Sequence, residues 1–534
     1  MSEENGLSAL LKKPSYDALR AGFRWEVPTY FNIGVACVDR WPADAPALLI
    51  ETGGGRFDEV TFGTVKHLSD RLGNALLAHG ARRGSRVAVV LPQGLAAAVA
   101  HTAVFKIGSV AVPLSVLFGH EALQHRLSDS GAGIVMTDRA RLERIEPVAR
   151  ELGATMIVTG DAVPSPHLGF EELIADASDV LVPAKTEADA PALIIYTSGT
   201  TGSPKGALHA HRVLLGHQPG FQLSHDRFPQ AGDRFWTPAD WAWIGGLMNG
   251  LFSSWCHGRP IAAAVRAGFD PEWAVGVMDS AGIRNVFLPP TALRLMRAAD
   301  VRLPEGRLRT VMSGGEVLGK DTHAWAREAL GVSVNEIYGQ TEANYVIGNC
   351  GELWPTRPGS MGRAYPGHDV DVDDGEIVVR LPDPVAFLGY WNDPAATSAK
   401  TDGGWIRTGD RGRRDDDGYF WFDGRVDDVI SSAGYRIGPE EIEQCLTGHP
   451  AVTLAAAIGV PDETRGEIIK AFVVLRDGRT PTDALAAEIQ SHVREQLAVY
   501  EYPRQIEFVD SLPMTVTGKV RRAELRRMDA EQRG

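Results

Sequence analysis

The chain has 534 residues, of which 44% are hydrophobic, and this length exceeds what one core usually serves, so two or more domains are expected. Its net charge of −14 argues against binding to nucleic acid or to an anionic membrane, because both require a basic surface. No apolar run approaches the roughly 18 residues of a membrane-spanning helix, so no such span is predicted.

The cysteines and the first residues indicate a cellular compartment. Cys37, Cys256, Cys350 and Cys445 are far apart and show no C-x-x-C spacing, which indicates neither a zinc site nor a disulfide framework. The first five residues carry two acids and no basic or long apolar region, unlike a signal peptide. We therefore expect a reducing, cytoplasmic location.

Residues 1–45 are predicted to form an N-terminal extension that packs on the body of the protein. This extension contains an amphipathic stretch near Leu7–Leu11 and an aromatic-rich segment with Trp25, Tyr30 and Phe31.

From residue 46 onward, apolar runs of strand length alternate with helical patterns. The expected strands cover 47–50, 86–91, 110–114, 133–137 and 155–158, and the expected helices cover 61–78, 95–107, 121–130 and 139–152. This alternation predicts a doubly wound parallel sheet. Residues 161–190 are expected to consist mainly of loops.

A second α/β run follows, with helices expected at 275–281, 291–299 and 321–330 and strands at 285–288, 310–312 and 332–337. Between 358 and 425, short apolar runs separated by turn signals predict a small β unit. We therefore predict an α/β fold whose large domain, residues 46–424, contains two doubly wound α/β layers plus that β unit.

The pattern changes again after Gly424. Gly438 and Pro439 precede two acids, which is typical of the start of a helix, and strands at 454–460 and 468–475 precede a helix at 485–497. Residues 425–534 are thus predicted to form a small, mobile α+β domain at the C-terminus.

A polar loop follows the apolar run 192–195. Residues 196–206 read Tyr-Thr-Ser-Gly-Thr-Thr-Gly-Ser-Pro-Lys-Gly, and such hydroxyls, glycines and a lysine suit a polyanion such as phosphate. The P-loop pattern does not fit, because Gly206 follows Lys205 where a magnesium-binding Ser or Thr should stand. The order of residues instead resembles the phosphate-binding signature of the adenylate-forming enzymes, which include acyl-CoA synthetases, aryl-CoA ligases, luciferases and adenylation domains.

Further motifs match the same family in its order. The resemblance implies that ATP is bound by a set of residues drawn from five segments: Thr197, Ser198, Gly199, Thr200, Thr201, Lys205, Gly315, Glu316, Tyr338, Gly339, Gln340, Asp410 and Arg425. Within this set Gly315 and Glu316 belong to the strand end that contacts adenine, and Asp410 and Arg425 belong to the ribose site. A carboxylate such as Asp410 can accept hydrogen bonds from both ribose hydroxyls.

Three residues are assigned to catalysis by resemblance. Thr341 would contact the α-phosphate, and Glu342 would hold Mg²⁺, for which a carboxylate oxygen is a suitable hard ligand. Lys519 matches the family's mobile catalytic lysine, whose charge would offset the negative charge that builds as one anion attacks another.

The resemblance also implies the reaction and its two stages. A carboxylic acid attacks the α-phosphate of ATP to give acyl-AMP and pyrophosphate, and the thiol of coenzyme A then displaces AMP. Between these steps the C-terminal domain would rotate about Asp427, so that Gly434, Tyr435 and Arg436 face coenzyme A in place of Lys519.

The identity of the acid is predicted from a segment that resembles acetyl- and medium-chain acyl-CoA synthetases. Trp243, Ile244 and Gly245, together with Gly339, are assigned to the acyl pocket. Acetate-specific members carry tryptophan where this chain has Gly339 and threonine where it has Gly245. The two glycines predict room for a medium-chain, branched or aryl acid, unless another side chain fills the space, and suggest a place in fatty acid metabolism. Each extra buried CH₂ would contribute about 0.8 kcal/mol to binding.

Several alternatives remain at this point. The acceptor could be the thiol of a carrier protein, although this chain contains no carrier domain. The acid could be acetate or propionate. The chain could also be a non-catalytic nucleotide-binding regulator, but the presence of Glu342, Asp410 and Lys519 argues against this. Acylation of Lys519 by a lysine acetyltransferase would neutralise its charge. A homo-oligomer is left open. A histidine group, His209, His211, His217 and His225, is interpreted as structural or solvated, because no spacing indicates a metal site.

Overall fold

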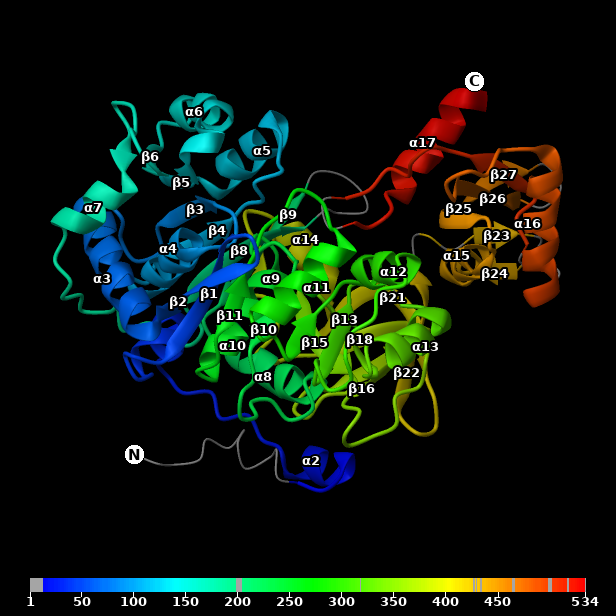
Figure 1. Ribbon diagram of the computed structural model, residues 1–534, viewed down its shortest axis with the longest axis horizontal. Helices are drawn as coiled ribbons and strands as arrows, with labels where there is room; N and C mark the ends of the chain where they lie inside the picture. Colours follow the sequence, from blue (N-terminus) through cyan, green and yellow to red (C-terminus); the bar gives the residue numbers. More distant parts are fainter. Residues whose placement is uncertain are drawn as a thin grey trace.

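The protein is described from a computed structural model that covers residues 13–197, 204–316, 318–425, 428, 430–432, 435–462, 466–497, 502–515 and 518–533. The stretch near Leu7–Leu11 lies outside the described residues, as do six of the predicted site residues, namely Ser198, Gly199, Thr200, Thr201, Asp427 and Gly434. In the described part of the chain, three β-sheets organise the fold (Figure 1).

The first sheet has the strand order β19-β9-β8-β4-β3-β5-β6-β7. Its strands are β3 (Arg86–Val90), β4 (Val110–Pro113), β5 (Ile134–Asp138), β6 (Thr155–Thr159), β7 (Leu168–Gly169), β8 (Pro191–Thr197), β9 (Lys205–Ala210) and β19 (Gly389–Tyr390). Strands β3 to β8 pair in parallel, whereas β9 runs antiparallel to both β8 and β19. This confirms the first predicted α/β layer, except that the strand expected at 47–50 lies in the second sheet.

The second sheet has parallel strands at its centre and antiparallel strands at both ends. Its order is β17-β18-β21-β22-β16-β15-β14-β13-β12-β10-β11-β1-β2, with β20 paired to β21. The strands are β1 (Pro46–Gly53), β2 (Arg56–Thr61), β10 (Phe235–Trp236), β11 (Ile261–Ala263), β12 (Asn285–Phe287), β13 (Thr310–Gly314), β14 (Val334–Gln340), β15 (Ala343–Gly348), β16 (Ser360–Ala364), β17 (Val370–Asp373), β18 (Glu376–Arg380), β20 (Thr401–Asp402), β21 (Trp405–Arg414) and β22 (Tyr419–Arg425). The predicted small β unit is therefore the antiparallel edge of the second layer.

Helices cover both sheets. They are α2 (Tyr16–Gly22), η1 (Val35–Asp39), α3 (Phe62–Ala78), α4 (Leu95–Lys106), α5 (His120–Ser130), η2 (Arg139–Arg141), α6 (Leu142–Glu151), α7 (Phe170–Asp176), α8 (Val213–Ser224), α9 (Ile244–Gly246), η3 (Leu247–Phe252), α10 (Ser253–Cys256), α11 (Pro271–Ser280), α12 (Pro290–Ala298), α13 (Lys320–Ala329) and α14 (Pro394–Lys400). Helix α4 is apolar around most of its circumference and nearly every residue in it is buried, as expected for a helix enclosed by other elements.

Several described helices were not predicted from the sequence, among them α7 and α8. Helix α7 forms within the segment that was expected to be loop, and it is too short to show a helical period clearly. Helix α8 was not predicted, because Gly216, Pro219 and Gly220 are poor helix formers. The structure explains these glycines: a Cβ added to Gly220 would lie 1.9 Å from the Tyr345 ring, and one added to Gly216 would lie 2.5 Å from the backbone nitrogen of Val385.

The third sheet lies in a separate small unit at the right of Figure 1. Strands β23 (Ile430–Ser432), β24 (Tyr435–Ile437), β25 (Val452–Asp462), β26 (Gly466–Leu475) and β27 (Gln505–Phe508) form it, with helices α15 (Pro439–Gly448), α16 (Asp483–Gln496) and α17 (Arg522–Arg533). All of these elements follow Arg425, so the predicted α+β C-terminal unit is present.

The described part of the N-terminal segment packs on the large unit. The hydroxyl of Tyr16 donates to the carbonyl of Ala364 at 2.9 Å, and the indole of Trp25 donates to the carbonyl of Gly367 at 2.8 Å. Among the described residues, no helix combines the length and apolar character needed to cross a bilayer.

Candidate active site

The hairpin of β8 and β9 carries the predicted phosphate loop. Thr197 and Lys205 face each other across the hairpin, on either side of the segment that lies outside the described residues. The ammonium of Lys205 lies 5.3 Å from the centroid of the Tyr390 ring. Helix α5 supports the hairpin, because His125 hydrogen-bonds to the carbonyl of Pro204 and Tyr196 donates to Asp129.

The second predicted motif lies at the end of β14, where the strand turns into β15. Glu342 is buried, with 7% of its surface exposed, and the hydroxyl of Tyr390 donates to its Oε1. The backbone nitrogen of Phe387 donates to the carbonyl of Glu342 at 2.9 Å. Burial and the neighbouring Glu342 raise the pKa of Tyr390, so this phenol remains a donor. The segment through β19 therefore holds Glu342 in place from two sides.

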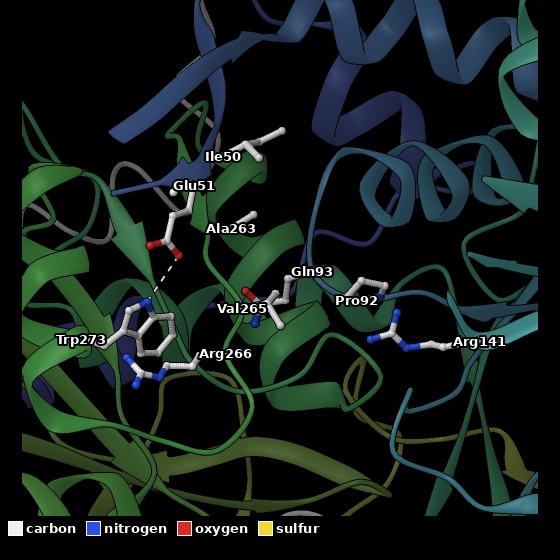
Figure 2. Close-up of a pocket in the computed structure, with 10 residues that line it drawn as sticks. Ile50, Glu51, Pro92, Gln93, Arg141, Ala263, Val265, Arg266 and Trp273 are labelled. Carbon is white, nitrogen blue, oxygen red and sulfur yellow. Dashed lines mark hydrogen bonds between the residues drawn. The ribbon is translucent and has the colours of Figure 1, made fainter. Parts of the chain in front are cut away.

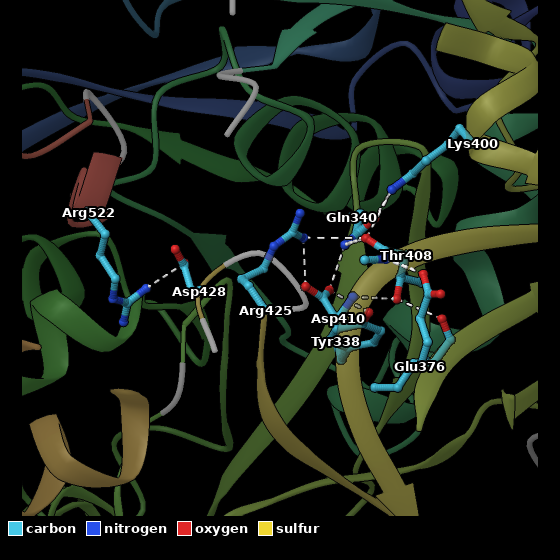
Figure 3. Close-up of polar contacts among 11 residues, drawn as sticks. Tyr338, Gln340, Glu376, Lys400, Thr408, Asp410, Arg425, Asp428 and Arg522 are labelled. Atoms are coloured by element: carbon cyan, nitrogen blue, oxygen red, sulfur yellow. Dashed lines mark hydrogen bonds and ion pairs between the residues drawn. The ribbon is translucent and has the colours of Figure 1, made fainter. Parts of the chain in front are cut away.

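The predicted ribose acceptor, Asp410, is the centre of a polar network (Figure 3). Its Oδ2 accepts from the hydroxyl of Tyr338 at 2.7 Å and from the amide of Gln340 at 2.5 Å. Its Oδ1 accepts from Arg425 at 2.7 Å. Burial beside this carboxylate raises the pKa of Tyr338. Tyr338, Gln340, Asp410 and Arg425 were predicted separately, and the structure brings them into direct contact.

The predicted adenine-side residues lie at the end of β13. Gly315 has a φ of 98°, which favours glycine. The Glu316 carboxylate forms an ion pair with Arg294 and accepts from the hydroxyl of Thr291 at 3.4 Å. Glu316 is thus held by α12 rather than left free at the strand end.

Lys519 is exposed and lies on a short turn closed by Thr515, which accepts from the Lys519 backbone nitrogen at 3.0 Å. A Cβ added to neighbouring Gly518 would lie 3.5 Å from the hydroxyl oxygen of Thr291. Gly518, beside Lys519, therefore lies against the same end of α12 that holds Glu316, one of the residues predicted to bind ATP.

Of the residues assigned to coenzyme A, Tyr435 and Arg436 are placed as backbone in β24, where they pair with Ser432 and Ser431 of β23. The turn between these strands includes Gly434, outside the described residues. The nearby junction residue Asp428 has its carboxylate 3.2 Å from Arg522 and 2.8 Å from Arg526 of α17.

Two protein-family models match this chain. Residues 36–391 match the model of the AMP-binding enzymes, and residues 441–519 match the model of the AMP-binding enzyme C-terminal domain. This chain belongs to the AMP-binding enzyme family.

Individual members of this adenylate-forming superfamily are similar over nearly their whole length. The chain is 34% identical to the mouse (Mus musculus) mitochondrial acyl-coenzyme A synthetase ACSM4, covering 94% of this chain and 91% of the relative. It is 34% identical to the acetyl-coenzyme A synthetase of Bacillus subtilis (strain 168), covering 88% and 85%. The crystal structure of the anthranilate CoA ligase AuaEII with anthranoyl-AMP superposes with a TM-score of 0.85 at 28% identity, covering 95% and 98%.

Of the residues assigned to the acyl pocket of this AMP-binding enzyme, Trp243, Ile244 and Gly245 lie in or next to α9, and Gly339 lies in β14. The ring of Trp243 contacts that of Phe118 in an edge-to-face arrangement at 5.9 Å. A Cβ added to Gly245 would lie 3.1 Å from the Phe287 ring, so an aromatic side chain adjoins the space that Gly245 leaves. A Cβ added to Gly339 would lie 2.3 Å from the backbone nitrogen of Tyr345, so Gly339 is also required by the β14–β15 turn.

A cavity of about 460 Å³ lies away from these residues (Figure 2). It opens between β1, β11, α11 and the end of β3, and its polar lining residues include Glu51, Gln93, Arg141 and Arg266. The indole of Trp273 donates to Glu51 at 3.4 Å there. None of the residues that the sequence assigned to ATP, the acid or coenzyme A lines this cavity.

The four histidines after the phosphate loop are structural. His209, His211, His217 and His225 are buried, and burial lowers the pKa of the first three to about 3, so they are neutral. Among the described residues, no group of three or more His, Cys, Asp or Glu side chains could hold a metal ion. All four cysteines are free thiols.

Sequence reasoning missed two residues of the site, Tyr390 and Lys400. Both lie in the segment that joins the two sheets, where the run Gly389-Tyr390-Trp391-Asn392 carries no charged motif. Lys400 ends α14, and its ammonium donates to Gln340 and to the carbonyl of Thr408, each at 3.0 Å. A tyrosine or a lone lysine outside a recognised motif gives no signal of chemistry in a single sequence.

Proposed function

We propose that this chain is an AMP-forming acyl-CoA synthetase that acts on a medium-chain, branched or aryl acid rather than on acetate. The proposal combines the family membership with the relatives described above, whose names include an acyl-coenzyme A synthetase and an anthranilate CoA ligase. The observation that carries it is the contact network in which Tyr338, Gln340, Asp410 and Arg425 form one site beside Glu342.

In the first half-reaction, the chain holds ATP and aligns it with the acid. Asp410 accepts the ribose hydroxyls, and Lys205 with the loop before it holds the departing pyrophosphate. Thr341 contacts the α-phosphate, and Lys519 supplies positive charge where the acid carboxylate attacks. The attack forms a bond between a carboxylate oxygen of the acid and the α-phosphorus of ATP. It breaks the bond between that phosphorus and the bridging oxygen of pyrophosphate, so that acyl-AMP and pyrophosphate result.

Glu342 fits the role of a magnesium ligand. Its carboxylate is buried and fixed by Tyr390, and Mg²⁺ is commonly held by one or two carboxylates together with substrate phosphates. The ion would supply charge neutralisation on the phosphates. In this protein Glu342 would hold it, and Tyr390 would keep the carboxylate pointing toward it.

In the second half-reaction, the thiol of coenzyme A attacks the acyl carbon and AMP leaves. Rotation of the C-terminal unit about Asp427 would exchange Lys519 for the β23–β24 turn near the acyl-AMP. Acetylation of Lys519 would remove its charge and block the first half-reaction selectively.

The preference for a larger acid rests on Gly245. Among the described residues, the near neighbour of a Cβ added there is the Phe287 ring, at 3.1 Å, and an aromatic wall of this kind suits aryl or branched acyl groups. A Cβ added to Gly339 would instead meet the backbone of Tyr345 at 2.3 Å, so this glycine serves the β14–β15 turn and does not support the preference.

A panel of acids with ATP and coenzyme A tests the proposal. We expect AMP release to be highest with an acid such as octanoate, isobutyrate or benzoate and much lower with acetate. A free carrier-protein thiol in place of coenzyme A should give no comparable AMP release. Activity that is highest with acetate and falls steadily with chain length would contradict the open pocket.

A matched variant sharpens this test. Gly245→Ala places a methyl group 3.1 Å from Phe287 and should lower kcat/KM for the largest accepted acid by about tenfold, while propionate changes less than twofold. Equal losses for all acids would show that Gly245 does not line the acyl pocket.

A further inference from the structure

Lys400 is an ammonium group inside the nucleotide site that no motif assigns. It is the last residue of α14, a helix that begins at Pro394 and is capped by Asp393, whose side chain accepts from the backbone nitrogen of Ala396. From there the half-buried side chain reaches β14 and β21 (Figure 3). Its Nζ donates to Oε1 of Gln340 and to the carbonyl oxygen of Thr408, each at 3.0 Å.

These contacts determine which way the amide of Gln340 points. With its oxygen on Lys400, the amide nitrogen donates to Oδ2 of Asp410 at 2.5 Å and to the carbonyl of Thr408 at 2.7 Å. A rotated amide would set its NH₂ against the ammonium and its oxygen against the carboxylate and the carbonyl. Both contacts would then be repulsive, so Lys400 selects the orientation in which Gln340 is a donor to Asp410.

The surrounding charges keep the ammonium in place. The carboxylates of Glu342, Asp410 and Glu376 attract it, and the guanidinium of Arg425 opposes it. Burial lowers the pKa of Lys400, and the three acids counter that change. Glu376 itself is held by Arg407 and by the backbone nitrogen of Gly409, so the acid side of this cluster does not move to follow Lys400.

We propose that Lys400 is a positioning residue for the nucleotide: through the amide of Gln340 it fixes the Asp410 carboxylate in the orientation that receives the ribose hydroxyls. This inference rests on the proposed function, because it takes Asp410 as the ribose acceptor. Lys400 acts through Gln340 and touches neither the acid nor the phosphates.

The test measures how well the enzyme distinguishes ATP from 2′-deoxy-ATP and 3′-deoxy-ATP in pyrophosphate release. Lys400→Met should raise the KM for ATP about tenfold, as expected when a hydrogen bond to a charged group is lost. The KM for the deoxynucleotides should change less than twofold and kcat should stay nearly constant. The ratio of kcat/KM for ATP to kcat/KM for the deoxynucleotides should therefore fall. A merely structural loss would affect all three nucleotides equally.

Three further variants complete the design. Lys400→Gln keeps a polar side chain and replaces the methionine variant if that one fails to fold, with the same expected loss of preference. Lys400→Arg retains donors and should restore most of the preference for ATP. Lys185→Met removes an equal charge at an exposed lysine whose ammonium lies 3.9 Å from the Tyr30 ring, and it should leave the preference unchanged.

Asp410→Asn tests the assignment of Asp410 to the ribose separately from the role of Lys400. If this variant loses the preference for ATP while folded Lys400→Met and Lys400→Gln keep the wild-type ratio, the role of Lys400 is refuted and the ribose assignment stands. If Asp410→Asn keeps the preference, the ribose assignment itself is wrong. If no acid supports pyrophosphate release in the wild-type protein, the proposed function fails before either question arises.

Discussion

At the scale of single residues, Tyr390 connects two parts of the site that are far apart in the sequence. Its hydroxyl donates to Glu342, its ring faces Lys205, and its backbone pairs with Ala207 in β9. The lysine next to the phosphate loop and the buried carboxylate are therefore held at a fixed separation by one side chain. A fixed separation is what the predicted roles require, because Lys205 and Glu342 are both expected to act on the phosphates of one nucleotide.

Tyr390→Phe should lower kcat/KM for acyl-AMP formation by about 10- to 100-fold, because a hydrogen bond to a charged group is worth about 1.5–3 kcal/mol. Pyrophosphate release at varied ATP measures this loss, whereas conversion of supplied acyl-AMP to the thioester should change less than twofold. Tyr419→Phe is the matched control: it removes another buried hydroxyl, one that donates to the carbonyl of Pro355, and its kcat/KM should match the wild type.

Lys519→Ala isolates the charge that the first half-reaction requires. Removing a cation from the developing negative charge should lower acyl-AMP formation at least 100-fold, by analogy with the loss of one stabilising donor at such a centre. Thioester formation from supplied acyl-AMP and coenzyme A should persist. An equal loss in both half-reactions would remove Lys519 from its assigned role.

At the scale of elements, the close approach of α8 to β15 explains why part of the fold was not predictable. Elements such as α3 and the parallel strands β3 to β6 were predicted to within a few residues. Helix α8 was not predicted, because glycine and proline usually interrupt a helix. The glycines of α8 instead allow close contact with Tyr345 and Val385, which lie more than 100 positions away in the sequence. A single sequence does not contain that contact.

The candidate site divides in the same way. Asp410, Glu342 and Gln340 lie in motifs whose residue types already suggest their chemistry, and the structure joins them. Tyr390 and Lys400 act through positions that only the tertiary fold supplies, since β19 and α14 meet β9 and β14 after long excursions of the chain. Their roles follow from contacts and not from spacing.

Gly220→Ala tests the packing of α8. The new methyl group would overlap the Tyr345 ring, and such overpacking should destabilise the protein by about 3 kcal/mol, seen as a lower midpoint of thermal unfolding. Gly276→Ala in α11 is the matched control, because no atom lies within 4 Å of its added Cβ. There alanine's better helix propensity should leave the midpoint unchanged or raise it slightly. Similar midpoints for both variants would mean that α8 yields to the ring without cost.

At the scale of the whole molecule, ion pairs on both sides of the junction bear on where the two units could turn. Arg425 is bound to Asp410 of the large unit. Asp428 is bound to Arg522 and Arg526 of α17, and Arg522 also binds Glu443 of α15. Each side of the junction is thus attached to its own unit, and only two residues separate Arg425 from Asp428.

A rotation that preserves these ion pairs would have to occur between Arg425 and Asp428. The sequence assigned the hinge to Asp427, which lies in this interval but outside the described residues, so that assignment stays a prediction.

Asp427→Pro would fix φ near −65° at this position and remove most of the rotation. We expect the variant to retain one half-reaction within about threefold and to lose the other by at least 100-fold, because each half-reaction needs a different face of the C-terminal unit. Pyrophosphate release reports the first half-reaction, and thioester formation from supplied acyl-AMP reports the second. If Asp427→Pro has wild-type thermal stability and keeps both half-reactions, the pivot lies elsewhere. If the double variant Asp427→Pro/Asp428→Ala also keeps both half-reactions, the ion pairs between Asp428 and α17 do not guide the rotation.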